Sequence, residues 1–364
     1  MIRTVFLVAV MAFFTQQAPE KGLQLVHADR HIGKKVNGEE LRIFEGNVYF
    51  EQDSLQMWCD RAVTHEQKKR IDFEGQVKVT DGHRTIRAKR IEYFWETRQA
   101  NCFSDVQIKS KNDSLFADYL EYNFKSGRVQ ARGDVFIFNR ENLTRIWGQI
   151  VQYNPDNKTS LVRQNAHLMK WDSTGNDTLN IYADILKYVK KDSQRIANAY
   201  DSVRIYQGKL KATCDTAIYY LDDEVAVLRS HPLAWYEDSE LRSDIMTVYF
   251  DSLKLRSILL EGNAMAKSLA DSANGEYDIL KGKKIYFYIH NKKPRRIVAI
   301  DNASSLYFIE DSTAEDKGAN FATADTIKIF MKEGKLDSIA ILGGARGTYY
   351  PQQFKKEAAV EDKQ

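Results

Sequence analysis

The chain has 364 residues, with 53 Lys and Arg against 50 Asp and Glu, and this balance excludes the concentrated positive charge of a typical nucleic-acid-binding protein. Aromatic residues make up 12% of the chain and only 5 residues are Pro, which favours a folded, β-rich protein over a disordered one. Three Cys residues without a CxxC spacing exclude a disulfide scaffold and the common zinc motifs.

The first eighteen residues have the pattern of an export signal. Arg3 supplies a positive charge, an apolar run follows from Val5 to Phe14, and a short polar stretch ends at Ala18. This run is too short for a membrane-spanning helix, which needs about 20 apolar residues. The alternative is a buried core element at the start of the fold. We expect residues 1–18 to be a signal peptide and the mature protein to be periplasmic.

One short phrase recurs along the rest of the chain. An apolar, a variable and a small residue, usually followed by Asp, precede an apolar-variable-apolar triplet, as in residues 115–122 and 181–188. The steps between copies run from 29 to 42 residues. The small position is occupied by Ala28, Cys59, Ala88, Ala117, Gly148, Ala183, Cys214, Ser243, Gly282 and Ala324. Similarity at a nearly constant period is the mark of a repeat architecture.

A second phrase lies between copies of the first and often has Gly at its midpoint, as at Gly133, Gly262 and Gly343. Both phrases alternate apolar and polar residues with a period of two, which is the pattern of strands with one buried face. The sequence therefore predicts about ten two-strand repeats. These occupy residues 19–351, and residues 352–364 are expected to be a polar, disordered tail.

The strands are predicted to be bent, because the apolar parity changes within the first phrase. Leu115 and Ala117 are odd-numbered, whereas Leu120 and Tyr122 are even-numbered. Successive side chains of a strand point to opposite faces, so the apolar set stays on one side only if a bulge or corner intervenes. The sequence therefore predicts an all-β stack of V-shaped antiparallel strands, in which two sheets face each other across an apolar trough.

The Ala-Asp phrase, the Gly-Asn-Val and Gly-Asp-Val stretches at 46–48 and 133–135, and the spacing near 30 resemble the OstA-like family of lipopolysaccharide-transport proteins over roughly residues 23–350. The resemblance implies an elongated open β-jellyroll, with the acyl chains of lipid A in the trough and the phosphorylated sugars in water. It also implies partners: lipopolysaccharide, and other jellyroll components of a transport bridge at the inner and outer membranes. The chain is longer than a minimal bridge subunit of that family.

Apolar residues of the inward parity are the candidates for contact with lipid. They are Phe73, Val77, Val79, Ile91, Tyr93, Val106, Ile108, Leu120, Tyr122, Val135, Ile137, Leu186 and Tyr188. A filled core would produce the same pattern. The alternative function is therefore a structural or adhesive β-solenoid scaffold.

The two ends of an open stack leave strand edges whose N–H and C=O groups can pair with another strand. The first edge is predicted at Leu25 and His27 and the last edge at Ile339 and Ile341. We expect these edges to support head-to-tail association with a second copy or with related jellyrolls.

No enzyme motif is recognisable in the sequence. The recurring Asp residues could form a carboxylate row for glycoside cleavage or calcium binding, which makes a carbohydrate-active enzyme a third hypothesis. An Asp beside a bend more often accepts hydrogen bonds from nearby backbone, and it recurs because the bend recurs. No catalytic residue, metal ligand, cofactor or nucleic-acid partner is therefore expected.

Overall fold

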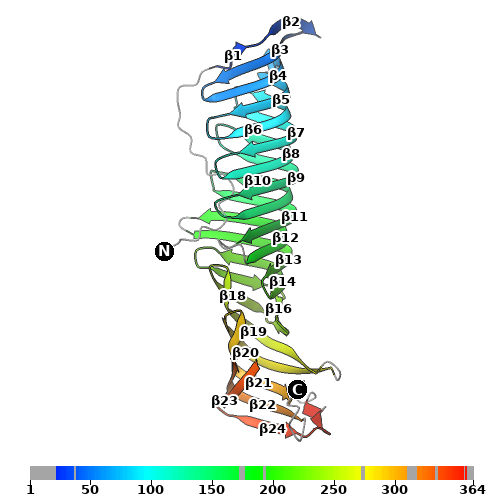
Figure 1. Ribbon diagram of the computed structural model, residues 1–364, viewed down its shortest axis with the longest axis vertical. Coiled ribbons are helices and arrows are strands. Elements are labelled where there is room, and N and C mark those ends of the chain that lie inside the picture. Colours follow the sequence, from blue (N-terminus) through cyan, green and yellow to red (C-terminus); the bar gives the residue numbers. More distant parts are fainter. Residues whose placement is uncertain are drawn as a thin grey trace. The chain divides into compact units, whose positions relative to one another are not determined.

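The computed structural model describes residues 22–36, 38–171, 177–191, 194–271, 275–309, 318–332, 335–355 and 357–358. The predicted signal peptide lies outside these residues. The described chain is almost entirely antiparallel β-structure, which confirms the predicted fold class (Figure 1). It divides into two compact units, Met1–Ser173 with Ala183–Ala197 and Thr174–Tyr182 with Asn198–Gln364.

The strands of the first unit follow one another in chain order. They are β1 (Gln24–His27), β2 (Arg30–Val36), β3 (Glu39–Gln52), β4 (Leu55–His65), β5 (Arg70–Thr80), β6 (Thr85–Phe94), β7 (Gln99–Lys109), β8 (Asp113–Asn123), β9 (Val129–Asn139), β10 (Thr144–Asn154) and β11 (Thr159–Trp171). A 3-10 turn, η1 (Glu66–Lys68), joins β4 to β5. Strands β12 (Thr178–Lys191) and β13 (Gln194–Gln207) contribute residues to both units.

The second unit, taken by itself, is also built of antiparallel strands. Its further strands are β14 (Leu210–Tyr220), β15 (Val225–Arg229), β16 (Leu233–Tyr236), β17 (Ser239–Arg242), β18 (Ile245–Asp251), β19 (Lys254–Asp271), β20 (Glu276–His290), β21 (Lys293–Phe308), β22 (Ala319–Lys332), β23 (Lys335–Leu342) and β24 (Arg346–Tyr350). In the segment that the sequence predicts to be a tail, Ala358 is buried in a cluster with Leu306, Phe308 and Ala319.

From β3 to β11, each strand pairs with the next and bends near its middle (Figure 1). The pairing register shifts once at each bend, for example between Phe116 and Tyr119 where β8 pairs with β9. Because of this shift, Leu115 and Leu120 are both buried although their parities differ. The predicted bend is confirmed, and Ala117 lies buried at it.

The corner of every second strand consists of two consecutive residues with positive φ, a conformation that non-glycine residues rarely adopt. The pairs are Gly46-Asn47, Gly75-Gln76, Ser104-Asp105, Gly133-Asp134, Gln164-Asn165, Asp201-Ser202, Ser230-His231, Gly262-Asn263, Asp301-Asn302 and Gly343-Gly344. Two left-handed residues in succession turn the strand sharply, so the chain direction at each corner is set by backbone conformation.

The recurring Asp of the neighbouring strand packs against this corner. Gly is the first corner residue at five places, and at each of them an added Cβ would collide with an Asp carboxylate: Asp29 at Gly46, Asp60 at Gly75, Asp118 at Gly133, Asp244 at Gly262 and Asp325 at Gly343.

Where Lys89, Gln149 or Lys283 replaces Asp, the corner residue is Ser104, Gln164 or Asp301 instead of Gly. Asp184 and Asp215 are exceptions, because Asp201 and Ser230 stand at their corners. The pairing of Gly with Asp supports the structural interpretation of the Asp row.

Candidate functional site

The bent strands β3 to β11 form two facing half-sheets, which we call arm A and arm B. Arm A ends in the turns 66–69, 95–98, 124–128 and 155–158, and arm B ends in the turns 53–54, 81–84, 110–112 and 140–143. Each strand contributes one half to each arm, so the inward side chains of both arms share one interior.

The predicted trough residues lie in this interior or continue it into β12. Those from β5 to β9 are at most 3% exposed: Phe73, Val77, Val79, Ile91, Tyr93, Val106, Ile108, Leu120, Tyr122, Val135 and Ile137. In β12, Tyr188 is buried and Leu186 is half-buried. The structure thus brings these residues onto one inward-facing surface, where side chains of the two arms fill the space between them.

Polar side chains join the ends of the two arms. The Tyr93 hydroxyl on arm A donates a hydrogen bond of 2.6 Å to Gln52 Oε1 on arm B, and Gln52 Nε2 donates one of 3.3 Å to the carbonyl of Trp95. Arg98 of arm A forms an ion pair with Asp53 of arm B. Gln52, Tyr93 and Arg98 are all buried. Burial raises the pKa of Tyr93, so its hydroxyl keeps its proton at neutral pH.

A third contact between the arms involves Arg84, which is 9% exposed. Its guanidinium carbon lies 5.4 Å from the ring centroid of Tyr122, within range of a cation–π interaction. Burial lowers the pKa of Arg84 to about 10, and the nearby Asp81 opposes this shift. We call the contacts of Gln52, Asp53 and Arg84 with arm A the latch.

Sequence reasoning missed the latch, although it left a signal. Gln52 continues the inward-facing series of Val48 and Phe50. Arg84 begins the inward-facing series of Ile86 and Ala88. A polar residue that continues an inward apolar series at a strand end needs a buried partner.

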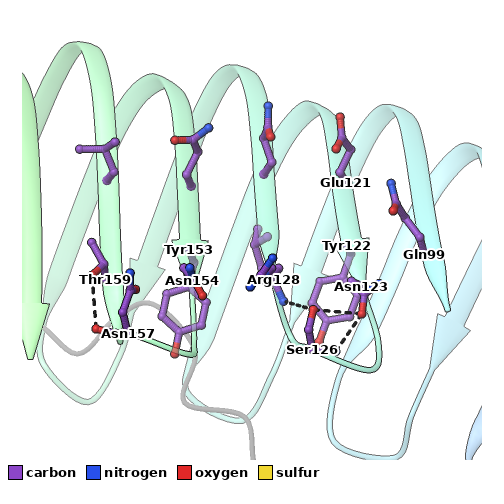
Figure 2. Close-up of a pocket in the computed structure, with 14 residues that line it drawn as sticks. Gln99, Glu121, Tyr122, Asn123, Ser126, Arg128, Tyr153, Asn154, Asn157 and Thr159 are labelled. Carbon is purple, nitrogen blue, oxygen red and sulfur yellow. Dashed lines mark hydrogen bonds between the residues drawn. The ribbon is translucent and has the colours of Figure 1, made fainter. Parts of the chain in front are cut away.

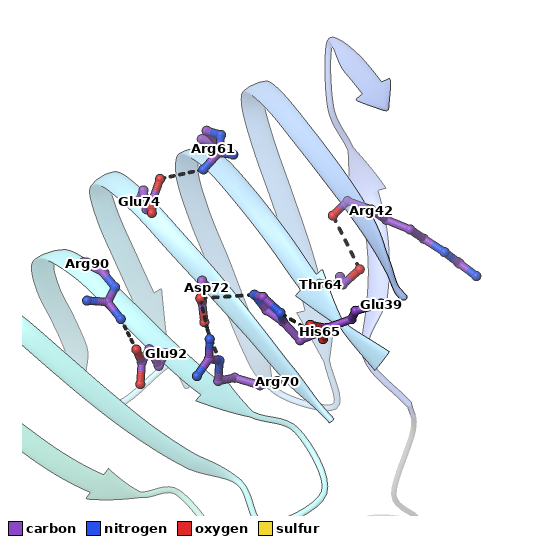
Figure 3. Close-up of polar contacts among 10 residues, drawn as sticks. All are labelled: Glu39, Arg42, Arg61, Thr64, His65, Arg70, Asp72, Glu74, Arg90 and Glu92. Atoms are coloured by element: carbon purple, nitrogen blue, oxygen red, sulfur yellow. Dashed lines mark hydrogen bonds and ion pairs between the residues drawn. The ribbon is translucent and has the colours of Figure 1, made fainter. Parts of the chain in front are cut away.

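The outer face of arm A carries cross-strand ion pairs near the N-terminal end (Figure 3). Arg61 Nη1 lies 2.7 Å from Glu74 Oε2, and Arg61 Nε lies 3.6 Å from Glu45 Oε1. His65 lies between Glu39 and Asp72, at 3.1 and 3.3 Å. Arg30 also pairs with Glu45 and Arg70 with Asp72, so cations and carboxylates are interspersed and this part of the outer face offers no concentrated charge to a ligand.

The three cysteines are buried and free. Burial raises the pKa of Cys59 and of Cys214 to about 12 and also raises that of Cys102, so none has the thiolate character of a nucleophile. Within the described ranges, no three His, Cys, Asp or Glu side chains gather closely enough to hold a metal ion. The part of the chain that the structure describes contains no helix long and apolar enough to cross a membrane.

The predicted assembly residues lie on edge strands. Strands β1 and β2 pair with β3, and β23 and β24 pair with β22. At the first edge Leu25 is 41% exposed and His27 is exposed, whereas at the last edge Ile341 is 37% exposed and Ile339 is half-buried. Exposed apolar side chains on an edge strand are suited to further strand pairing.

Part of the chain matches a known protein family. Residues 20–177 match the model of a family described as OstA-like protein. No curated protein matches the chain. The family match confirms the resemblance over this segment, and it indicates a β-structured protein of the lipid-transport type, a class typically found outside the cytoplasm.

Proposed function

Because residues 20–177 are OstA-like, we propose that the protein is a periplasmic conduit for lipopolysaccharide. In this proposal residues 1–18 direct export, and the interior between arms A and B shields acyl chains during transport to the outer membrane. The observation that carries the proposal is the apolar interior, which continues from β3 to β11 and is bounded along one side only by non-covalent contacts between the arms.

The physical reason for such a conduit is the cost of exposing hydrocarbon to water, about 25 cal/mol for each Å². A continuous apolar interior removes that cost at every position along the stack. Successive repeats offer nearly equivalent surroundings, so a lipid can move from one to the next without chemical conversion. The energy that gives lipid transport its direction would have to be supplied by another component.

Lipid entry requires the arms to separate, because side chains fill the interior in the described conformation. Each hydrogen bond of the latch contributes about 0.5–1.5 kcal/mol net, and bonds to charged groups contribute about 1.5–3 kcal/mol. Burial of hydrocarbon contributes about 0.8 kcal/mol for each CH₂ group. One acyl chain of a dozen carbons therefore outweighs the latch.

The full burial of the same side chains also favours a second function, a structural or adhesive scaffold with a permanently filled core. Such a protein would keep its arms together and would bind no lipid. The two functions differ in whether acyl chains ever contact the interior residues.

Assembly partners belong to the same proposal. Both edges carry exposed apolar side chains, and an added jellyroll could extend the hydrogen-bond ladder together with the interior. We propose head-to-tail contact with a second copy, or with jellyroll components at the inner and outer membranes.

Photo-crosslinking tests the conduit directly. A photoreactive amino acid at Leu120 or Val135 should capture lipopolysaccharide in cells that make it, because these side chains face the interior. The adjacent positions Glu121 and Phe136 face outward and serve as matched controls with weak capture. Equal capture at both parities, or no capture at interior positions in several repeats, would support the scaffold instead.

A further inference from the structure

A pocket of about 490 Å³ lies at the end of arm A, in the notch between the turns 124–128 and 155–158 (Figure 2). Side chains of both parities line it. Tyr122 and Tyr153 belong to the inward rows of the strands, whereas Gln130 and Gln152 belong to the outward row. The pocket therefore connects the outer surface of arm A with the margin of the interior.

The notch has a specific cause in the backbone. Along arm A the first residue of a turn donates a hydrogen bond to the last residue of the preceding turn: Trp95 N to Lys69 O at 3.2 Å, and Phe124 N to Arg98 O at 2.8 Å. The next turn begins with Pro155, which has no N–H group and cannot donate the equivalent bond. The side chains of Arg128 and Asp156 join these two turns instead.

Amide side chains dominate the lining, and six of the fourteen lining residues are Asn or Gln. Two of them have a local role: Asn123 Oδ1 accepts a hydrogen bond of 2.8 Å from Ser126 N, and Asn154 Oδ1 accepts one of 3.1 Å from Asp156 N. Such bonds are typical of Asn in turns. The local role explains these two residues without a ligand.

Gln152 and Asn157 are different, because their side-chain amides make no hydrogen bond to any residue that the structure describes. Gln152 lies between Gln130 and Leu161 in the outward row. Each amide supplies both donors and an acceptor, which matches the mixed hydrogen bonding of sugar hydroxyl groups. The pocket thus presents free donors and acceptors next to two tyrosine side chains.

The charges in the pocket argue against a phosphate ligand. Its cation, Arg128, is paired with Asp156, and the Glu121 carboxylate, which accepts a hydrogen bond of 3.0 Å from Tyr119, lines the same space. A phosphate would meet a carboxylate and a cation already neutralised. An uncharged, hydroxyl-rich group meets no such opposition.

We propose that this pocket binds an uncharged sugar unit. The proposal rests on the proposed function in one respect: we assign the sugar to an uncharged part of the lipopolysaccharide, beyond its phosphorylated sugars, while the acyl chains occupy the interior. Tyr122 and Tyr153 line the pocket from the inward rows, so a lipid held between the arms would present its sugar here.

The test uses the full chain and a neutral oligosaccharide built from hexoses, with binding followed by saturation-transfer NMR. The double variant Gln152→Leu, Asn157→Leu should weaken binding at least tenfold. Gln107→Leu, an outward half-buried Gln on arm B, is the matched control and should bind as the wild type does. Unchanged affinity of the double variant, or displacement of the sugar by inorganic phosphate, would overturn the proposal.

A second variant tests the cause of the notch. Pro155→Ala restores an N–H group, which should let the two turns bond to each other, narrow the pocket and weaken sugar binding while circular dichroism stays unchanged. A fluorescent fatty acid measured with the same variants separates the two proposals. A variant that loses sugar binding but keeps fatty-acid binding supports the sugar pocket. If the wild type binds the sugar but no fatty acid, the sugar pocket stands and the conduit is refuted. Undiminished sugar binding by Pro155→Ala would refute the notch as the binding place.

Discussion

The carboxylate of Asp118 on β8 occupies the space that a side chain on Gly133 of β9 would need. A Cβ at Gly133 would lie 2.9 Å from Asp118 Cγ and would overlap with Oδ2, while the φ angle of Gly133 is +77°. The left-handed backbone favours Gly at this corner, and the collision with Asp118 excludes a side chain there. The same relationship holds at Gly46, Gly75, Gly262 and Gly343, so this pair of residues recurs at five of the ten corners described above.

The Gly133→Ala variant should lose stability for two separable reasons. A left-handed conformation costs a non-glycine residue about 1–2 kcal/mol, and the collision with Asp118 adds to it. The control is Gly82→Ala, because Gly82 has a φ of +85° but no atom within 4 Å of the added Cβ. Urea denaturation should show the larger loss at Gly133.

The contribution of Asp118 can be isolated by a double-mutant cycle. In an Asp118→Gly background, which also removes the Asp118 Cβ that would lie 2.8 Å from the added Cβ, the cost of Gly133→Ala should fall to that of Gly82→Ala. Costs that simply add would show that Asp118 does not limit the corner.

The latch predicts a measurable effect of one hydroxyl group. Tyr93→Phe removes the donor to the buried oxygen of Gln52, and leaving such a group unpaired costs about 1–3 kcal/mol. We expect a lower urea midpoint and, if lipid enters between the arms, faster uptake of a fluorescent fatty acid. Tyr49→Phe is the control, since the Tyr49 hydroxyl contacts Glu51 on the outer face. If Tyr93→Phe and Tyr49→Phe have the same urea midpoint, the latch does not stabilise the fold.

The cysteines give a prediction about pH. Burial raises the pKa of Cys59 and Cys214 to about 12, whereas a cysteine of the unfolded chain titrates near 8.5. Above about pH 8.5 the unfolded state loses protons that the folded state keeps, so the free energy of unfolding should fall as the pH rises. A variant with Ala in place of all three cysteines should show a shallower fall. In the wild type at pH 8, a thiol reagent should react quickly only after urea is added; rapid reaction in the native state would show that the thiols are accessible.

The bend was predictable because it leaves a mark in the linear pattern. The parity change between Ala117 and Leu120 requires an extra residue in the pleat, whatever the rest of the fold is. The inward residues follow from the same alternation.

The latch and the pocket depend on which turns meet in space. Gln52 and Tyr93 are 41 positions apart and lie on opposite arms, so only the number of strands between them and the closure of the arms bring them together. Pro155 is unremarkable in a turn by itself. Its importance arises from the hydrogen bonds that neighbouring turns make and that it cannot make.

The last prediction concerns the edge strand β23. Its residues alternate between bonding to β22 and directing their N–H groups away from it. Of two double variants, Ile339→Pro with Ile341→Pro and Ser338→Pro with Ala340→Pro, one should break the pairing with β22 and lower stability, because Pro removes ladder donors. The other should keep the fold and lose only the outward donors. If the edge mediates assembly, this second variant should lose self-association in analytical ultracentrifugation and partner capture in pull-down experiments. Association at wild-type strength in the variant that keeps the fold would refute assembly through this edge.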